Sequence, residues 1–232
     1  MQWKMLFGAR ATAVALGIAM FVAPIIQGSA AAAEPPKEWD GLERIPNKRM
    51  DLVYVRPQAT LAAYKRVKLD PVRVSFDKDW DPNRGERSPS RMLSKSDIEE
   101  IKTDLATEFR KVFVEELSKG GYAVVEQNDD DVLGVTAIIM DLYITAPERP
   151  GSGRSHTYIN DAGHMTLAIE LRDSVTDQLL ARAVDKAQGA YVGRMQVSNG
   201  VTNSAEARRA IVQWADVLRD ALDEVHGKPG QK

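Results

Sequence analysis

The chain has 232 residues and a formal net charge of -2; 44% of its residues are hydrophobic and 28% are charged. This composition is typical of a globular protein, and it lacks the excess of basic residues that nucleic-acid binding requires. The chain contains no cysteine, which excludes disulfides, a thiol nucleophile, thiolate zinc sites and a lipid anchor on cysteine. The fold must therefore be held together by burial of apolar side chains.

Residues 1–33 have the pattern of a secretory signal peptide. Lys4 and Arg10 make the start basic, and residues 11–26 are apolar and uncharged. Small residues up to Ala33 then offer a cleavage site. The alternative is an uncleaved membrane anchor, but the apolar run is shorter than the roughly 20 residues of a membrane span. We therefore expect cleavage near Ala33 and a periplasmic protein that is not lipidated, because cysteine is absent.

The rest of the chain reads as a lead-in, one domain and a tail. Residues 34–51 are polar and contain several prolines, so we expect an extended, poorly ordered lead-in there. A single α+β domain is predicted over residues 52–227, with a disordered tail at 228–232. The domain begins with a short β-rich run at residues 52–55.

A second strand is predicted at residues 66–76, and its pattern contains a fault. The apolar residues alternate in one phase up to Leu69 and in the other phase from Val72 onward. A change of phase requires one extra residue, and Pro71 has no N–H to donate to a ladder. The pattern predicts a β-bulge at Asp70 and Pro71 on an edge of the sheet.

The clearest helix follows a charged loop at residues 77–95. Ser96 and Glu99 have the spacing of a capping box at its start. Apolar residues then recur at three- and four-residue intervals, and Gly120 supplies the end. This helix must bury one face against another element.

Four strands are predicted after this helix, at residues 122–126, 133–145, 165–172 and 179–187. The strand at 133–145 is apolar on both faces, which favours a central position. The strand at 165–172 alternates apolar and polar residues, as expected when one face meets solvent. Residues 173–177 have turn composition and join the last two strands as a hairpin.

A second amphipathic helix closes the chain, with Asn203 or Ser204 as its N-cap and with Gly227 and Pro229 beyond its end. The predicted order is β-β-α-β-β-β-β-α. We expect a two-layer sandwich with a mixed, mostly antiparallel sheet of about five to six strands and both helices on one face.

Several blocks of the sequence match one bacterial family in content and order. They are Leu52-Val53-Tyr54-Val55-Arg56-Pro57, Leu61-x-x-Tyr64-Lys65-x-Val67-x-Leu69-Asp70-Pro71-Val72, Gly121-Tyr122-x-Val124-Val125, Glu170-Leu171-Arg172-Asp173-Ser174-Val175-Thr176, Leu179-Leu180-Ala181, Ala183-Val184-Asp185 and Ala210-x-x-x-Trp214-Ala215. In these blocks the chain resembles a family of predicted lipoproteins, domain of unknown function 3313 (DUF3313), from about residue 52 to 223. The resemblance implies an envelope location and no catalytic residues. Members commonly have a lipobox cysteine, which this chain lacks, so a soluble periplasmic form is expected.

Histidines and a glycine-containing loop are weak candidate sites. His156, His164 and His226 lack the spacing of a zinc site, and we expect them to be solvated or to cap a helix end. Arg149, Arg154 and His156 flank a loop with Gly151 and Gly153 and form a candidate anion-binding patch; the alternative is a flexible hairpin loop.

Alternating aspartates in the charged loop resemble the first ligands of a calcium-binding loop. They are Asp77, Asp79 and Asp81. However, Pro82 occupies the position of the required glycine, and Ser88 occupies that of the bidentate glutamate. We therefore expect no metal and no cofactor.

Trp80 lies in the same loop, away from any apolar stripe. Exposed aromatic residues are enriched in contacts with partners. The alternative is that Trp80 folds back over the edge of the sheet. The candidate binding residues are thus Trp80, Arg149, Arg154 and His156.

Nothing in the sequence indicates catalysis, because no nucleophile elbow or metal motif is present. We predict a non-catalytic binding or accessory protein that contacts another envelope protein through an open sheet edge or the loop around Trp80. The alternative is a module that binds a small ligand near residues 147–164; an enzyme is the least favoured reading. No nucleic-acid partner is expected. Contact with a membrane is expected only if the leader stays uncleaved.

Overall fold

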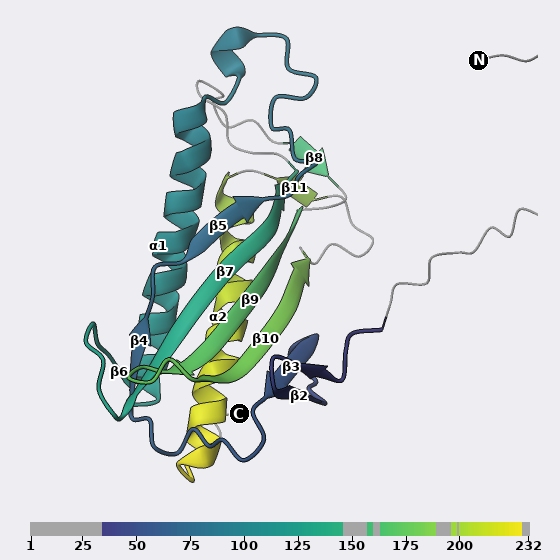
Figure 1. Cartoon of the computed structure of the whole chain (residues 1–232). Helices are drawn as coiled ribbons and strands as arrows, with labels where there is room; N and C mark the ends of the chain where they lie inside the picture. Colours follow the sequence, from purple (N-terminus) through teal and green to yellow (C-terminus); the bar gives the residue numbers. More distant parts are fainter. Residues whose placement is uncertain (1–33, 146–156, 160–162, 189–195, 199, 229–232) are drawn as a thin grey trace, which may run out of the picture. The chain divides into compact units, whose positions relative to one another are not determined.

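Within the residues that the structure describes, a nine-stranded mixed sheet is combined with two long helices. The computed structural model describes residues 34–145, 157–159, 163–188, 196–198 and 200–228 (Figure 1). The described residues from Pro36 onward make up one compact unit. The predicted α+β class is confirmed, whereas the sheet has nine strands among the described residues instead of the expected five to six.

The strands of the main sheet follow the order β1-β2-β3-β10-β9-β7-β4-β6, and β5 also pairs with β7. β4 and β5 run parallel to β7, and β6 runs parallel to β4, whereas the other pairs are antiparallel. Their bounds are Glu38–Trp39 (β1), Leu42–Ile45 (β2), Leu52–Val55 (β3), Arg66–Leu69 (β4), Arg73–Phe76 (β5), Ala123–Val124 (β6), Val132–Ile144 (β7), Gly163–Asp173 (β9) and Leu179–Gln188 (β10). Thr157–Ile159 (β8) and Gln196–Ser198 (β11) form a separate antiparallel pair.

Both helices pack on one face of the sheet, as predicted (Figure 1). α1 spans Lys95–Lys119 and α2 spans Gly200–Val225, and a short 3-10 turn, η1, precedes α1 at Pro89–Arg91. α2 thus starts about one turn before the caps expected at Asn203 and Ser204.

The core lies between the two layers. Alternate residues of β7 and β9 point to the helices and are buried, while their neighbours on the other face are partly exposed. The main contributors are Phe109, Phe113, Ile139, Leu167, Ile211 and Trp214. The central position predicted for residues 133–145 is confirmed, because β7 lies between β9 and the β4–β5 edge.

The start of α1 differs from the prediction by two residues. Its N-cap is Ser94, whose Oγ accepts a hydrogen bond of 3.2 Å from the backbone N–H of Asp97. The Asp97 carboxylate in turn accepts one of 2.7 Å from the Ser94 N–H. The capping box is therefore Ser94 and Asp97, not Ser96 and Glu99. Both pairs have the required spacing, and the apolar periodicity that follows does not choose between them.

The expected lead-in is not simply extended, because β1 and β2 form a hairpin that adds to β3. Asp40 and Gly41 make its turn with φ of 54° and 73°. Leu42 is completely buried against Tyr54 and Leu179. Leu42 is the one buried residue in these two strands, so the sequence carries no alternation that would predict them.

The predicted bulge in residues 66–76 is confirmed. Leu69 pairs with Val135 and Arg73 pairs with Ile138. The segment from β4 to β5 therefore advances four positions while β7 advances three. The extra residue divides the predicted strand into β4 and β5. Between them the N–H of Asp70 still donates to the Val135 carbonyl at 3.0 Å.

Candidate functional site at the open edge of the sheet

β5 lies at an edge of the sheet, beside α1 (Figure 1). It pairs with β7 on one side, and no other strand among the described residues pairs with it. Arg73 and Ser75 are exposed, while Val74 and Phe76 are half-buried. The strand therefore presents an unpaired backbone edge next to side chains that alternate between solvent and core.

A groove of about 690 Å³ runs between this edge and α1. This edge groove is lined by Asp70, Pro71, Val72, Val74, Lys102, Thr103, Ala106, Thr107, Arg110, Lys111 and Val114. The hydroxyls of Thr103 and Thr107 donate to carbonyls one turn earlier in α1, at 2.9 Å and 2.8 Å. The threonines therefore need no external partner, and the small side chains of this helix face leave space along the edge.

Cations outnumber carboxylates in the edge groove. Lys102, Arg110 and Lys111 line it, against the single carboxylate of Asp70. That carboxylate already accepts a hydrogen bond of 2.6 Å from Thr136 Oγ1. Lys102 pairs with Glu99 and Arg110 pairs with Glu126, so Lys111 supplies the positive charge of the groove that is not ion-paired among the described residues, and it favours a ligand that carries negative charge.

The cations of this region differ in their engagement. Arg110 donates to the Leu69 carbonyl at 3.0 Å and pairs with Glu126. It therefore occupies a backbone acceptor at the end of β4. Arg73 and Lys111 are exposed and form no ion pair with any described residue. These two residues are the cations most available to a partner.

Trp80 lies at the far end of the same edge. Its indole ring stacks on Phe76, the last residue of β5, with centroids 3.9 Å apart and planes at 6°. Its Nε1 donates to the Ile144 carbonyl at 2.9 Å. Lys102 Nζ lies 5.8 Å from the Phe76 ring centroid. Trp80 thus folds back over the edge, the second of its two expected placements, and it is half-buried.

The other candidate binding residues, Arg149, Arg154 and His156, lie outside the described residues. His164 stacks on Tyr143, with centroids 5.4 Å apart, and its Nε2 is 3.7 Å from a carboxylate oxygen of Asp77.

The aspartates of the charged loop cap turns. Asp77 Oδ1 accepts the N–H of Asp79 at 2.8 Å, and Asp81 Oδ1 accepts that of Asn83 at 3.0 Å. Within the described ranges, no group of three His, Asp or Glu side chains is placed to hold a metal ion.

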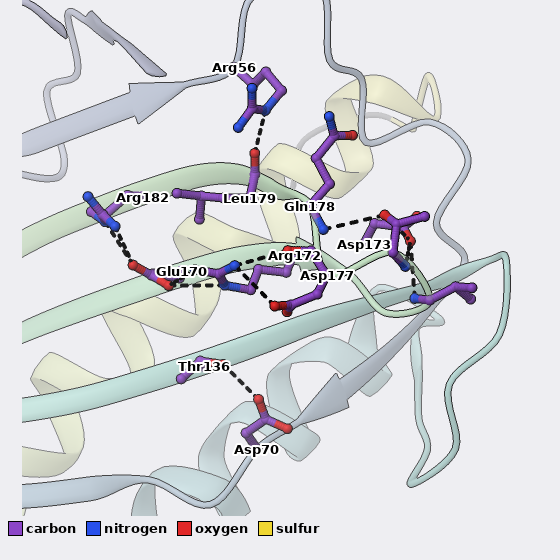
Figure 2. Close-up of polar contacts among 12 residues, drawn as sticks. Arg56, Asp70, Thr136, Glu170, Arg172, Asp173, Asp177, Gln178, Leu179 and Arg182 are labelled. Atoms are coloured by element: carbon purple, nitrogen blue, oxygen red, sulfur yellow. Dashed lines mark hydrogen bonds and ion pairs between the residues drawn. The ribbon is translucent and has the colours of Figure 1, made fainter. Parts of the chain in front are cut away.

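The helix-free face of the sheet carries a polar network (Figure 2). Glu170 accepts hydrogen bonds from Arg172 at 2.8 Å and from Arg182 at 2.6 Å. Arg182 also donates to Asp40 at 2.8 Å and lies 4.0 Å from the ring centroid of Trp39. Burial alone would raise the pKa of Glu170, but its two arginine partners outweigh burial and hold that pKa below its usual value. The network is internally satisfied, which indicates a structural role.

The buried charges between the helices are also paired. Arg219 contacts Glu116 at 3.0 Å, Asp216 at 2.9 Å and Asp220 at 3.1 Å. Burial raises the pKa of Asp216, and nearby Glu116 raises it further, although Arg219 opposes both. Since buried charges are costly without partners, this cluster is best explained as a clamp between α1 and α2.

The groove residues of α1 were missed by the sequence reasoning. Thr103, Thr107, Arg110 and Lys111 form a second stripe beside the apolar stripe of the helix. Periodicity identifies the buried stripe, but it does not say which exposed side lies next to a sheet edge. That information depends on the packing of α1 against β5.

The described residues form a two-layer α+β fold with a groove beside an unpaired strand edge. The chain belongs to the family described as "Protein of unknown function (DUF3313)", whose model matches residues 36–218. The resemblance expected from the sequence blocks is confirmed. No curated protein matches the chain.

Solved structures are similar only at low scores. A PelC dodecamer from Paraburkholderia phytofirmans shares 11% identity, with 69% of this chain and 92% of that chain covered and a TM-score of 0.35. A DUF330 protein from Xanthomonas campestris shares 11%, with coverages of 75% and 91% and a TM-score of 0.41. A DUF4136 family protein from Bacteroides thetaiotaomicron shares 8%, with coverages of 79% and 98% and a TM-score of 0.35. At these scores the likeness says nothing about what this chain binds.

None of the helices in the described part of the chain combines the length and apolarity needed to cross a membrane.

Proposed function

We propose that this protein is a non-catalytic binding module exported to the cell envelope, and that its edge groove holds an extended acidic segment of another envelope protein. The observation that carries the proposal is the unpaired edge of β5, flanked by Arg73 on the strand and by Lys111 in the groove, two cations that form no ion pair with any described residue. Export is supported by the signal-peptide pattern of residues 1–33.

An added strand explains how such a segment would bind. Its backbone would hydrogen-bond to the free edge of β5, which gives affinity without a particular sequence. Successive side chains of a strand point to opposite faces, so acidic residues at neighbouring positions of the segment would meet Lys111 on the helix side and Arg73 on the helix-free side. The stacked pair of Phe76 and Trp80 would offer an aromatic contact at one end.

The absence of catalysis remains part of the proposal. The charged groups on the helix-free face and between the helices are engaged in ion pairs, as Glu170 and Arg219 illustrate. Groups committed in this way are poorly placed to transfer protons or attack a substrate. This argument favours binding over chemistry.

The test is site-specific photo-cross-linking in intact cells of the source bacterium, with a photoreactive amino acid at position 75. Ser75 is exposed on β5, so an added strand would lie within reach of it. We expect an adduct with one envelope protein whose cross-linked peptide is acidic. The same adduct should be absent when the photoreactive residue replaces Glu224, which is exposed at the end of α2.

A charge-reversal pair separates recognition from proximity. The double variant Arg73→Glu/Lys111→Glu should lose the adduct, because it places negative charge beside an acidic segment. The matched variant Lys37→Glu/Lys48→Glu makes the same change in net charge at exposed positions away from the groove and should keep it. An adduct that survives the first variant, or one formed only with other copies of this chain, would refute the proposal.

A further inference from the structure

A second hollow lies between the N-terminal halves of the two helices and the ends of β7, β9 and β10. Its volume is about 920 Å³, within the roughly 300–1,000 Å³ of small-molecule sites. It is lined by Ile101, Asp104, Leu105 and Glu108 of α1. The edge groove uses a different face of α1, so the two hollows are distinct.

The inner wall of this interhelix cavity is apolar. Its principal residues are Ile101, Leu105, Leu142, Met165, Ala207 and Trp214. Alanines on α2 leave room that larger side chains would fill. The lining runs along α2 from Ser204 to Trp214, which corresponds to about 15 Å of helix. The cavity is therefore elongated along the helix and suits an extended ligand more than a compact one.

The arginines at the rim of the interhelix cavity already have partners. At the rim, Arg208 pairs with Glu108 and Glu115, and Arg209 pairs with Glu206.

Deeper in the cavity the one buried carboxylate is also occupied. Asp185 accepts hydrogen bonds from Trp214 Nε1 at 2.7 Å and from the N–H of Asp51 at 3.1 Å. A polar ligand would find few free partners inside, whereas apolar surface is available for burial.

We propose that the interhelix cavity binds the hydrocarbon chain of an amphipathic molecule, that is, a single acyl chain whose polar head stays at the rim among the paired charges. The elongated shape, the apolar wall and the paired arginines at the rim all fit this ligand class. The site goes beyond the edge groove, and neither proposal depends on the other.

The experiment uses 11-(dansylamino)undecanoic acid, a fluorescent fatty acid. It is titrated into the purified protein that comprises residues 34–232. We expect saturable binding with a blue-shifted emission that palmitate displaces. Ala207→Phe fills the cavity and should weaken binding by about tenfold or more, because an occupied cavity leaves no space for a chain. Ala221→Phe makes the same exchange on α2, beyond the cavity, and should bind like the wild type.

Thermal unfolding of each variant shows whether it remains folded, and Ala210→Leu serves as a milder filling variant if Ala207→Phe unfolds. Absence of displaceable binding in the wild type would overturn the proposal, as would equal affinity in the filled and control variants. The double variant Arg73→Glu/Lys111→Glu should bind the probe normally, so failure at this cavity is distinguishable from failure at the edge groove.

Discussion

Asp173 closes the hairpin between β9 and β10 with four hydrogen bonds. Its Oδ1 accepts from the N–H of Val175 at 3.1 Å and from the N–H and hydroxyl of Thr176 at 2.7 Å and 2.9 Å. Its Oδ2 accepts from the Tyr64 hydroxyl at 2.9 Å. The turn chemistry that predicted this hairpin thus rests on one carboxylate, which also ties the turn to the segment before β4.

The electrostatics of Asp173 give a pH-dependent prediction. The Thr176 N–H, helped by Tyr64 and opposed by burial, holds the pKa of Asp173 below its usual 3.8. The stability it contributes is therefore present above pH 3.8 and lost as pH falls through the lower folded-state pKa. Burial, with the bond to Asp173, raises the pKa of Tyr64 from 10.0 to about 12, so the stability linked to Tyr64 is complete below pH 10 and is lost as pH rises from there through about 12.

Asp173→Ala should lower the free energy of unfolding by about 1–3 kcal/mol at pH 7, since it leaves several donors without an acceptor. The difference from wild type should shrink as the pH falls below 3.8. Urea unfolding at pH 7 and at several acid values measures both effects. Asp130→Ala removes an exposed carboxylate from another turn and should change stability by less than about 0.5 kcal/mol. A loss that is the same at every pH would contradict this account.

At the scale of the element, α1 shows that a helix can be predicted correctly while the prediction of its first residue is wrong. Periodicity located its apolar stripe and Gly120 its end, but two possible capping boxes overlap at its beginning. The observed cap uses Ser94, and Ser96 is exposed within the first turn.

Ser94→Ala should therefore destabilise the protein by about 1 kcal/mol, the usual effect of losing an N-cap. Ser96 Oγ lies 2.7 Å from Ser94 Oγ, but this hydrogen bond is exposed and is replaced by water, so Ser96→Ala should cost less than about 0.5 kcal/mol. Chemical denaturation of the two variants side by side provides the measurement. If Ser96→Ala proved the more damaging of the two, the helix would start where the sequence pattern placed it.

The same scale shows how far the sequence could predict the candidate site. The bulge at Asp70 follows from the phase change and Pro71, and it correctly indicates an edge. The groove beside β5 does not follow, because it requires the packing of α1 against that edge. Trp80 left two placements open, and its stacking on Phe76 depends on a loop path that no local pattern specifies.

At the scale of the whole molecule, the difference that matters most is where the domain begins. Two short strands before residue 52 extend the sheet and form a small second cluster of buried side chains. They were missed because both strands are short and show no alternation of buried and exposed residues. The one buried anchor, Leu42, becomes informative only when it meets Tyr54 and Leu179. The start of the domain is thus defined by the pairing of β2 with β3 and by contacts between residues distant in sequence, and not by local strand propensity.

The boundary can be tested with Leu42→Ala and with a shortened chain that starts at residue 47. Leu42 is fully buried, so Leu42→Ala should cost about 2–5 kcal/mol of unfolding free energy. Removing β1 and β2 altogether should cost at least as much, because it also uncovers Tyr54. Ile45→Ala, at a side chain that is 38% exposed, is the matched control and should cost less than about 1 kcal/mol. Urea unfolding of the shortened and the longer chain provides the measurement. If the two chains were equally stable, β1 and β2 would contribute nothing to the stability of the domain, and its core would be complete from residue 52.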